Sequence, residues 1–253
     1  NFTPFLTIYL FSFASSKLAF VPTVTTSSYW FQKLILDNTP FSNLKIEYDN
    51  FTLNGNGYGF VGKDLKFEQY STSRTATFNN IGKIDNDGNI ISSLDYVYNK
   101  YESTLNLNNS IINEIVNYGG TTNITNSAIA KLTNNAGSYG IGIINLNNVN
   151  FLDTNKGTVI SNYGGIRGEI NGNFSGHTSS VILNQEYGGG GIDLIKGTFS
   201  NNTTTSYGSA IRNTNNSTIK SVTADFINNN NYAVYNVGTI NFLDENTRLT
   251  STI

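Results

Sequence analysis

The chain has 253 residues, of which 13 % are charged and 38 % are hydrophobic, and its formal net charge at pH 7 is −2. This balance excludes a strongly basic nucleic-acid-binding protein and a disordered polyelectrolyte. The chain has no cysteine, which excludes disulfide bonds, thiolate metal sites and thiol catalysis.

Residues 1–40 differ from the rest, because the run from Asn1 to Ser16 carries no charged side chain. The run lacks the basic start of a secretory signal, is shorter than the ~20 residues of a transmembrane helix and contains Pro4. We therefore expect no transmembrane span but a strand or cap that is apolar on both faces, with a retained export signal as the alternative. One face carries Phe5, Tyr9, Phe11 and Phe13, and the other carries Phe2, Leu6, Ile8 and Leu10.

From about residue 41, short apolar segments alternate with Asn and Gly turns. The stretch "GYGFVGK" at 57–63 fits the bare dinucleotide-binding fingerprint. No βαβ unit surrounds it, so glycine turns are the simpler interpretation. The stretch "DNDGN" at 85–89 lacks the glycine and glutamate of an EF-hand calcium loop and is predicted to be a turn.

A repeat becomes regular in the second half of the chain. Tyr-Gly pairs begin at Tyr118, Tyr139, Tyr163, Tyr187 and Tyr207, at intervals of 21, 24, 24 and 20 residues. The apolar segments between them are too short for helices and are bounded by Gly and by some of about 40 asparagines. A period of ~20–25 residues with short strands predicts a solenoid of stacked parallel strands. We expect Ile, Val and Phe to stack inside it, among them Ile211, Phe226 and Ile240, and asparagines to form amide ladders.

Three motifs carry a family resemblance. They are Gly208-Ser209-Ala210-Ile211, Phe226-Ile227-Asn228-Asn229 and Gly238-Thr239-Ile240. They resemble the repeats of pectin-lyase-like right-handed parallel β-helices, and most closely the passenger domains of bacterial autotransporters and polymorphic outer-membrane proteins. The resemblance covers about residues 115–253, and no unit has the full Gly-Gly-Ala-Ile spelling. It implies an all-β, right-handed parallel β-helix (β-solenoid) over residues 41–253, preceded by the apolar strand or cap, and a location outside the cell or on its surface.

Catalytic residues are not expected. His177 is the only histidine, and the resemblance implies that a pectin-degrading member would carry Gly-His-Gly and Arg-x-Lys motifs. Here His177 is followed by Thr178, Arg167 is followed by Gly168-Glu169, and the acidic residues are scattered. We therefore expect no metal ligands and no cofactor, with a polysaccharide lyase or hydrolase acting on acidic glycans as the alternative. An ice-binding solenoid ranks third, because the sequence shows no regular Thr-x-Thr column.

The expected function is that of a non-enzymatic extracellular or cell-surface protein, either an adhesin-like rod or a filament subunit. The Tyr-Gly tyrosines are the candidate binding residues, as an exposed aromatic strip or, on the simpler interpretation, a buried ladder. The apolar residues from Phe2 to Phe13 are the candidate assembly residues, because an uncharged strand can add to the open edge of a neighbour. Expected partners are neighbouring copies, glycans or host or cell-surface proteins, and no nucleic acid.

Overall fold

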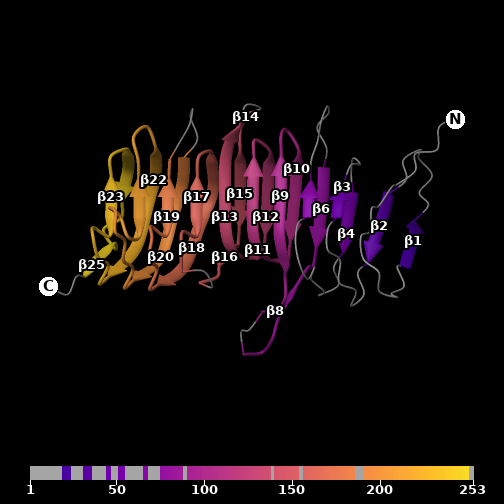
Figure 1. The fold of residues 1–253 in the computed structure, drawn as a ribbon, viewed down its shortest axis with the longest axis horizontal. Coiled ribbons are helices and arrows are strands. Elements are labelled where there is room, and N and C mark those ends of the chain that lie inside the picture. The colour runs from indigo at the N-terminus through magenta and orange to yellow at the C-terminus, as the bar shows by residue number, and fades with distance from the viewer. Residues whose placement is uncertain are drawn as a thin grey trace.

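Regular structure in this protein consists of stacked β-strands. The computed structural model describes residues 19–23, 31–35, 44–46, 51–54, 65–67, 75–87, 90–137, 140–153, 156–185 and 191–250, and every regular element in these ranges is a strand. The strands stack along the long axis of the molecule, from β1 (Ala19–Thr23) near one end to β25 (Arg248–Thr250) near the other (Figure 1). Nearly all neighbours run parallel, so the chain is an all-β parallel β-helix, as the sequence predicts.

Each full coil contributes strands to three stacks, which we call sheets 1, 2 and 3, and each coil is one rung of the stack. Sheet 1 contains β4 (Phe51–Asn54), β6 (Thr75–Asn79), β10 (Thr104–Asn108), β12 (Thr121–Thr125), β15 (Ile143–Asn147), the first parts of β18 (Gly165–Ser175), β20 (Gly191–Ser200) and β22 (Thr218–Ile227), and β24 (Thr239–Leu243). Sheet 2 contains the first parts of β11 (Ile111–Tyr118) and β13 (Ala128–Gly137), β16 (Asn150–Phe151), the later parts of β18, β20 and β22, and β25. Sheet 3 contains β3 (Leu44–Ile46), β5 (Leu65–Phe67), β9 (Leu94–Lys100), the later parts of β11 and β13, β17 (Ile160–Asn162), β19 (Ile182–Asn184), β21 (Ile211–Asn213) and β23 (Val234–Asn236).

The remaining strands are attached to these sheets. Strand β1 pairs antiparallel with β2 (Phe31–Ile35), which pairs parallel with β4. A hairpin of β7 (Lys83–Ile84) and β8 (Ile90–Ser92) projects from the rod (Figure 1). The two-residue strand β14 (Gly140–Ile141) folds back on the end of β13.

The core lies inside the coil and follows the two-residue alternation of the strands. Ile211 is 0 % exposed, Phe226 is 1 % exposed, and Ile240 is half-buried and packs against the core, which confirms the predicted inward set. Phe226 stacks on Phe199 with ring centroids 5.3 Å apart, and Phe199 stacks on Phe174 at 5.1 Å. Equivalent apolar residues therefore bury one another from rung to rung.

Asparagine turns the chain from sheet 1 to sheet 2. Asn80, Asn109, Asn126 and Asn148 occupy this corner on successive rungs, with φ between 48° and 54°. This left-handed backbone is one that asparagine tolerates better than other residues with a side chain. The asparagine at each of these positions therefore favours the corner through its own backbone preference.

A buried asparagine ladder closes the opposite part of each coil, at the end of sheet 3. Each amide nitrogen Nδ2 donates to the Oδ1 of the next rung over 2.7–3.0 Å, which confirms the expectation of amide ladders. The buried members are Asn99, Asn117, Asn134, Asn162, Asn184 and Asn213, and the last member, Asn236, is exposed. The sequence separations between them run from 17 to 29 residues, so the coils differ widely in length.

The first described strands lie before residue 41, where the sequence analysis expects the β-helix to begin. Strands β1 and β2 fall within the predicted apolar segment 1–40, and β2 already pairs in parallel with β4. The predicted assembly residues, from Phe2 to Phe13, lie outside the described residues, as does the glycine-rich stretch 57–63.

Candidate functional site

The Tyr-Gly pairs do not mark a single position of the coil. Tyr118 and Tyr163 each follow a ladder asparagine and are half-buried at the end of sheet 3, with Asn135 on the rung between them. Tyr207 lies at a different corner, shortly before β21, and is 53 % exposed. Tyr139 and Tyr187 lie outside the described residues.

Tyr207 belongs to an aromatic cluster near the C-terminal end of the rod. Its ring stacks on Tyr235 with centroids 5.0 Å apart and planes 18° apart. Tyr232 packs against Tyr207 at 5.8 Å and is 66 % exposed. We call Tyr207, Tyr232 and Tyr235 the tyrosine cluster.

The backbone holds the tyrosine cluster in place. Gly208 has a φ of 76°, and a Cβ at this position would lie 2.5 Å from the carbonyl oxygen of Ile211 and 3.0 Å from the Cβ of Tyr235. Glycine is therefore required for the chain to carry Tyr207 over Tyr235. Tyr232 itself has a φ of 60°, a left-handed conformation that is uncommon for an aromatic residue.

An arginine borders the tyrosine cluster. Arg212 pairs with Tyr235 in the register of β21 and β23, and its Nη1 donates to the Ser206 hydroxyl over 3.3 Å. Its Nε is buried and has no hydrogen-bond partner. The surface thus combines open aromatic rings, phenol hydroxyls and a guanidinium group, which suits contact with another molecule.

Three of these four residues, Arg212, Tyr232 and Tyr235, were missed by the sequence analysis. Arg212 and Tyr235 occupy the middle of an apolar-x-Asn triplet, as in Ile211-Arg212-Asn213, that repeats along the chain. In Ile211-Arg212-Asn213 the isoleucine and the asparagine are buried, so Arg212 points outward, and Tyr235 takes the paired position on the next rung. This triplet, rather than the Tyr-Gly pair, is the signal that marks equivalent positions.

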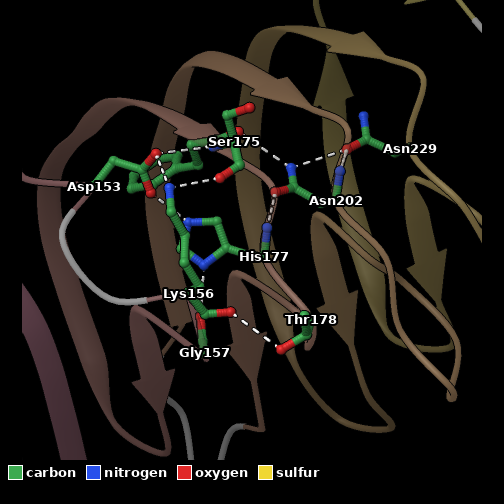
Figure 2. A network of polar contacts seen from close by, with 9 residues as sticks. Asp153, Lys156, Gly157, Ser175, His177, Thr178, Asn202 and Asn229 are labelled. Carbon is green, nitrogen blue, oxygen red and sulfur yellow. Dashed lines mark hydrogen bonds and ion pairs between the residues drawn. The ribbon is translucent and has the colours of Figure 1, made fainter.

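His177 lies in a polar network at the end of β18 (Figure 2). Its imidazole is 0 % exposed, and its Nδ1 is 2.7 Å from the carbonyl oxygen of Gly157. Its Nε2 is 2.6 Å from the Asp153 carboxylate, which also accepts from Lys156 Nζ over 2.7 Å. The carbonyl oxygen can only accept, so Nδ1 donates to it, and Nε2 is hydrogen-bonded to the Asp153 carboxylate.

The hydrogen bonds of this network explain why the only histidine of the chain is buried, and they involve no substrate. Both ring nitrogens are bonded within the protein, which leaves neither to accept a proton from a bound hydroxyl group. The backbone N–H of His177 donates to Oδ1 of Asn202, and the backbone N–H of Asn202 donates to Oδ1 of Asn229. His177 is therefore the first residue of a second internal series of hydrogen bonds that involve asparagine side chains. Arg167 lies on sheet 1 instead, where it pairs with Asp193 at 3.4 Å.

An ion pair joins β25, on the last described rung, to β22 on the rung before it. Arg248 on β25 makes two hydrogen bonds of 2.7 and 2.8 Å to Asp225 on β22. The Arg248 guanidinium lowers the pKa of the Asp225 carboxyl from its usual value, and the carboxylate raises the pKa of Arg248. The backbone N–H and side-chain amide of Asn246 lower the pKa of Asp244 in the adjoining turn.

Within the described ranges, no group of three or more His, Asp or Glu side chains is placed to hold a metal ion. None of the described segments forms a helix long and apolar enough to cross a membrane.

In the comparisons with known proteins, no family model, curated protein or solved structure matches the chain.

Proposed function

We propose that the protein is a non-enzymatic, adhesin-like rod that works outside the cell or on its surface and holds its partner through the tyrosine cluster. The observation that carries this proposal is the exposure of Tyr207 and Tyr232 on a backbone that positions both rings. Tyrosine and arginine dominate the binding energy of many interfaces, because they bury a large area at a low cost in side-chain entropy. The sequence resemblance to autotransporter passenger domains agrees with this role.

The rod supplies the support that such a site needs. The tyrosine cluster lies on strands and corners joined by rung-to-rung hydrogen bonds, including Ser209 N–H to the carbonyl of Tyr232 over 2.9 Å. A site on a rigid scaffold loses little conformational entropy on binding. The partner is a host or cell-surface protein or a glycan, and the weakly negative chain is not suited to nucleic acid.

Changing Tyr207 and Tyr232 together to serine should weaken adhesion at least tenfold. The double variant removes most of the open aromatic surface, while the stacked core below it is unchanged. The measurement is the binding of the labelled protein to cultured host cells, to bacterial surfaces and to a glycan array.

Tyr163→Ser is the matched control, because this half-buried tyrosine lies outside the cluster, and it should leave adhesion unchanged. Equal adhesion by the double variant and the parent would contradict the proposal. Release of sugar from pectic or other acidic glycans would instead favour the polysaccharide lyase or hydrolase alternative.

Self-assembly is a second candidate, favoured by the edge of the last described rung, whose strands pair on one side only within the described part of the chain. Among the described strands, β23 pairs only with β21, and β24 and β25 pair only with β22. Such an edge exposes backbone N–H and C=O groups that another strand can pair with. We propose that an apolar strand from the beginning of a neighbouring copy, between Phe2 and Phe13, adds at an edge and builds a filament.

Removing residues 1–20 should abolish filaments and leave the circular dichroism spectrum of a folded β-helix. An excess of a peptide of residues 1–20 should block assembly of the intact chain, because it competes for the same edge. Electron microscopy of negatively stained samples provides the measurement. Filaments that form equally well without the segment would exclude the donor-strand role.

A further inference from the structure

A groove of about 490 Å³ runs along the corner between sheets 1 and 2, beside the β7–β8 hairpin. The groove shares no residue with the tyrosine cluster, whose Tyr207 lies between sheets 2 and 3 and whose Tyr235 lies on β23. Its lining comes from successive rungs, namely 82–84, 109–111, 126–128, 148–150 and Asn171. Four steps between these rungs span roughly 19 Å at about 4.8 Å per step.

The floor of the groove is rigid. Ser110 and Ser127 are buried, and their hydroxyls donate to the carbonyl oxygens of Asn108 and Thr125 over 2.8 Å. The Ser127 hydroxyl also accepts from the backbone N–H of Ser110 over 3.0 Å. Val149 takes the equivalent place on the next rung. The floor groups are therefore satisfied within the protein and do not compete for a ligand.

One rim of the groove presents incompletely bonded amides. The corner ladder joins Asn148 Nδ2 to Asn126 Oδ1 over 2.8 Å, and Asn109 Nδ2 to Asn80 Oδ1 over 3.3 Å. No side-chain hydrogen bond joins Asn126 to Asn109 on the adjacent rung. In the described part of the chain, Asn126 Nδ2 is therefore a free donor and Asn109 Oδ1 is a free acceptor. All of these asparagines are exposed and held by left-handed backbone.

The other rim changes from apolar to polar along its length. Ile111 and Ala128 form its first part, and the exposed amides of Asn150 and Asn171 form the second, neither with a hydrogen bond to another described side chain. The hairpin closes one end with Lys83 and Ile84. Lys83 is the only charged residue among the described residues that line the groove.

We propose that this groove binds a neutral oligosaccharide of about four pyranose units, laid along the rod axis. A pyranose unit is about as long as one rung step of ~4.8 Å, so successive sugars meet equivalent amides. Each amide offers a donor and an acceptor, as does each sugar hydroxyl, and the apolar C–H faces of the rings fit Ile111 and Ala128. The absence of a second charge among the described lining residues favours a neutral chain over a polyuronate.

Titration calorimetry with cellotetraose, chitotetraose and tetragalacturonate tests the proposal on the intact chain. At least one neutral tetrasaccharide should bind. Asn126→Asp should weaken that binding about three- to tenfold, because it removes one free donor. It retains the oxygen that accepts from Asn148 and a side chain that tolerates left-handed backbone. Ala128→Trp should abolish binding by filling the groove.

Asn216→Asp is the matched control, because Asn216 is also exposed with a φ of 62° and lies outside the groove. It makes the same chemical change and should not alter the affinity. Asn150→Ala gives a second readout if Ala128→Trp fails to fold, and it too should weaken binding.

Four results would overturn the proposal. They are failure of both neutral chains to bind the parent, unchanged affinity in a folded Ala128→Trp protein, equal affinities of Asn126→Asp and Asn216→Asp, and a preference for tetragalacturonate. The proposal does not depend on the tyrosine cluster, so the Tyr207 and Tyr232 double variant should bind the same chain normally.

Discussion

Phe226→Asp is expected to lower the free energy of unfolding of the C-terminal coils by about 4 kcal/mol or more. Phe226 is buried and stacks on Phe199, so aspartate would remove an aromatic contact and place a carboxylate among apolar side chains. Circular dichroism during thermal and urea unfolding measures the loss. Hydrogen exchange should show that the rungs around β22 open first, because a solenoid is stabilised by contacts between neighbouring coils.

Ile227→Asp is the control for this prediction. Ile227 is the next residue of β22 and only half-buried, so its replacement should cost much less than that of Phe226. The comparison tests the register directly, because a slip of one residue along the strand exchanges the inward and outward faces. A Phe226→Asp protein that melts at the temperature of the parent would show that the register is wrong.

Asn162→Asp is expected to cost about 3 kcal/mol, although the side chain keeps its size. Asn162 is buried in the middle of the ladder, where Nδ2 donates to Asn184 Oδ1 over 2.7 Å and to the carbonyl oxygen of Gly164 over 2.9 Å. A carboxylate has no hydrogen to donate, so two acceptors would face a buried negative charge. Urea unfolding followed by circular dichroism measures the change.

The effect of pH distinguishes a lost donor from general disruption. In acid the new carboxyl group takes up a proton and can donate to Asn184, so the variant should recover part of its stability relative to the parent. Asn147→Asp on the exposed end of β15 is the control and should change stability by less than about 0.5 kcal/mol. A loss that is equal at neutral and acidic pH would contradict the role assigned to the ladder hydrogen.

The fold followed from the sequence because its signals are local. Short alternating segments place Ile211 and Phe226 on the inward face without reference to any other coil. Asparagine favours the left-handed corner at Asn109 and Asn126 through its own backbone preference. The sequence therefore determined that the chain is β-rich, that it turns at asparagines and that its strands stack as a solenoid.

Only the tertiary structure decided which residues share a site. The ladder spacing varies from 17 to 29 residues, so equal spacing in the sequence does not identify equivalent rungs. Tyr118 and Tyr207, which share a Tyr-Gly motif, consequently lie at different corners, whereas Tyr207 meets Tyr235. The same holds for His177, which meets Asp153 24 residues earlier. Contacts between rungs depend on the length and path of each loop, and the residues on either side of a contact do not encode those quantities.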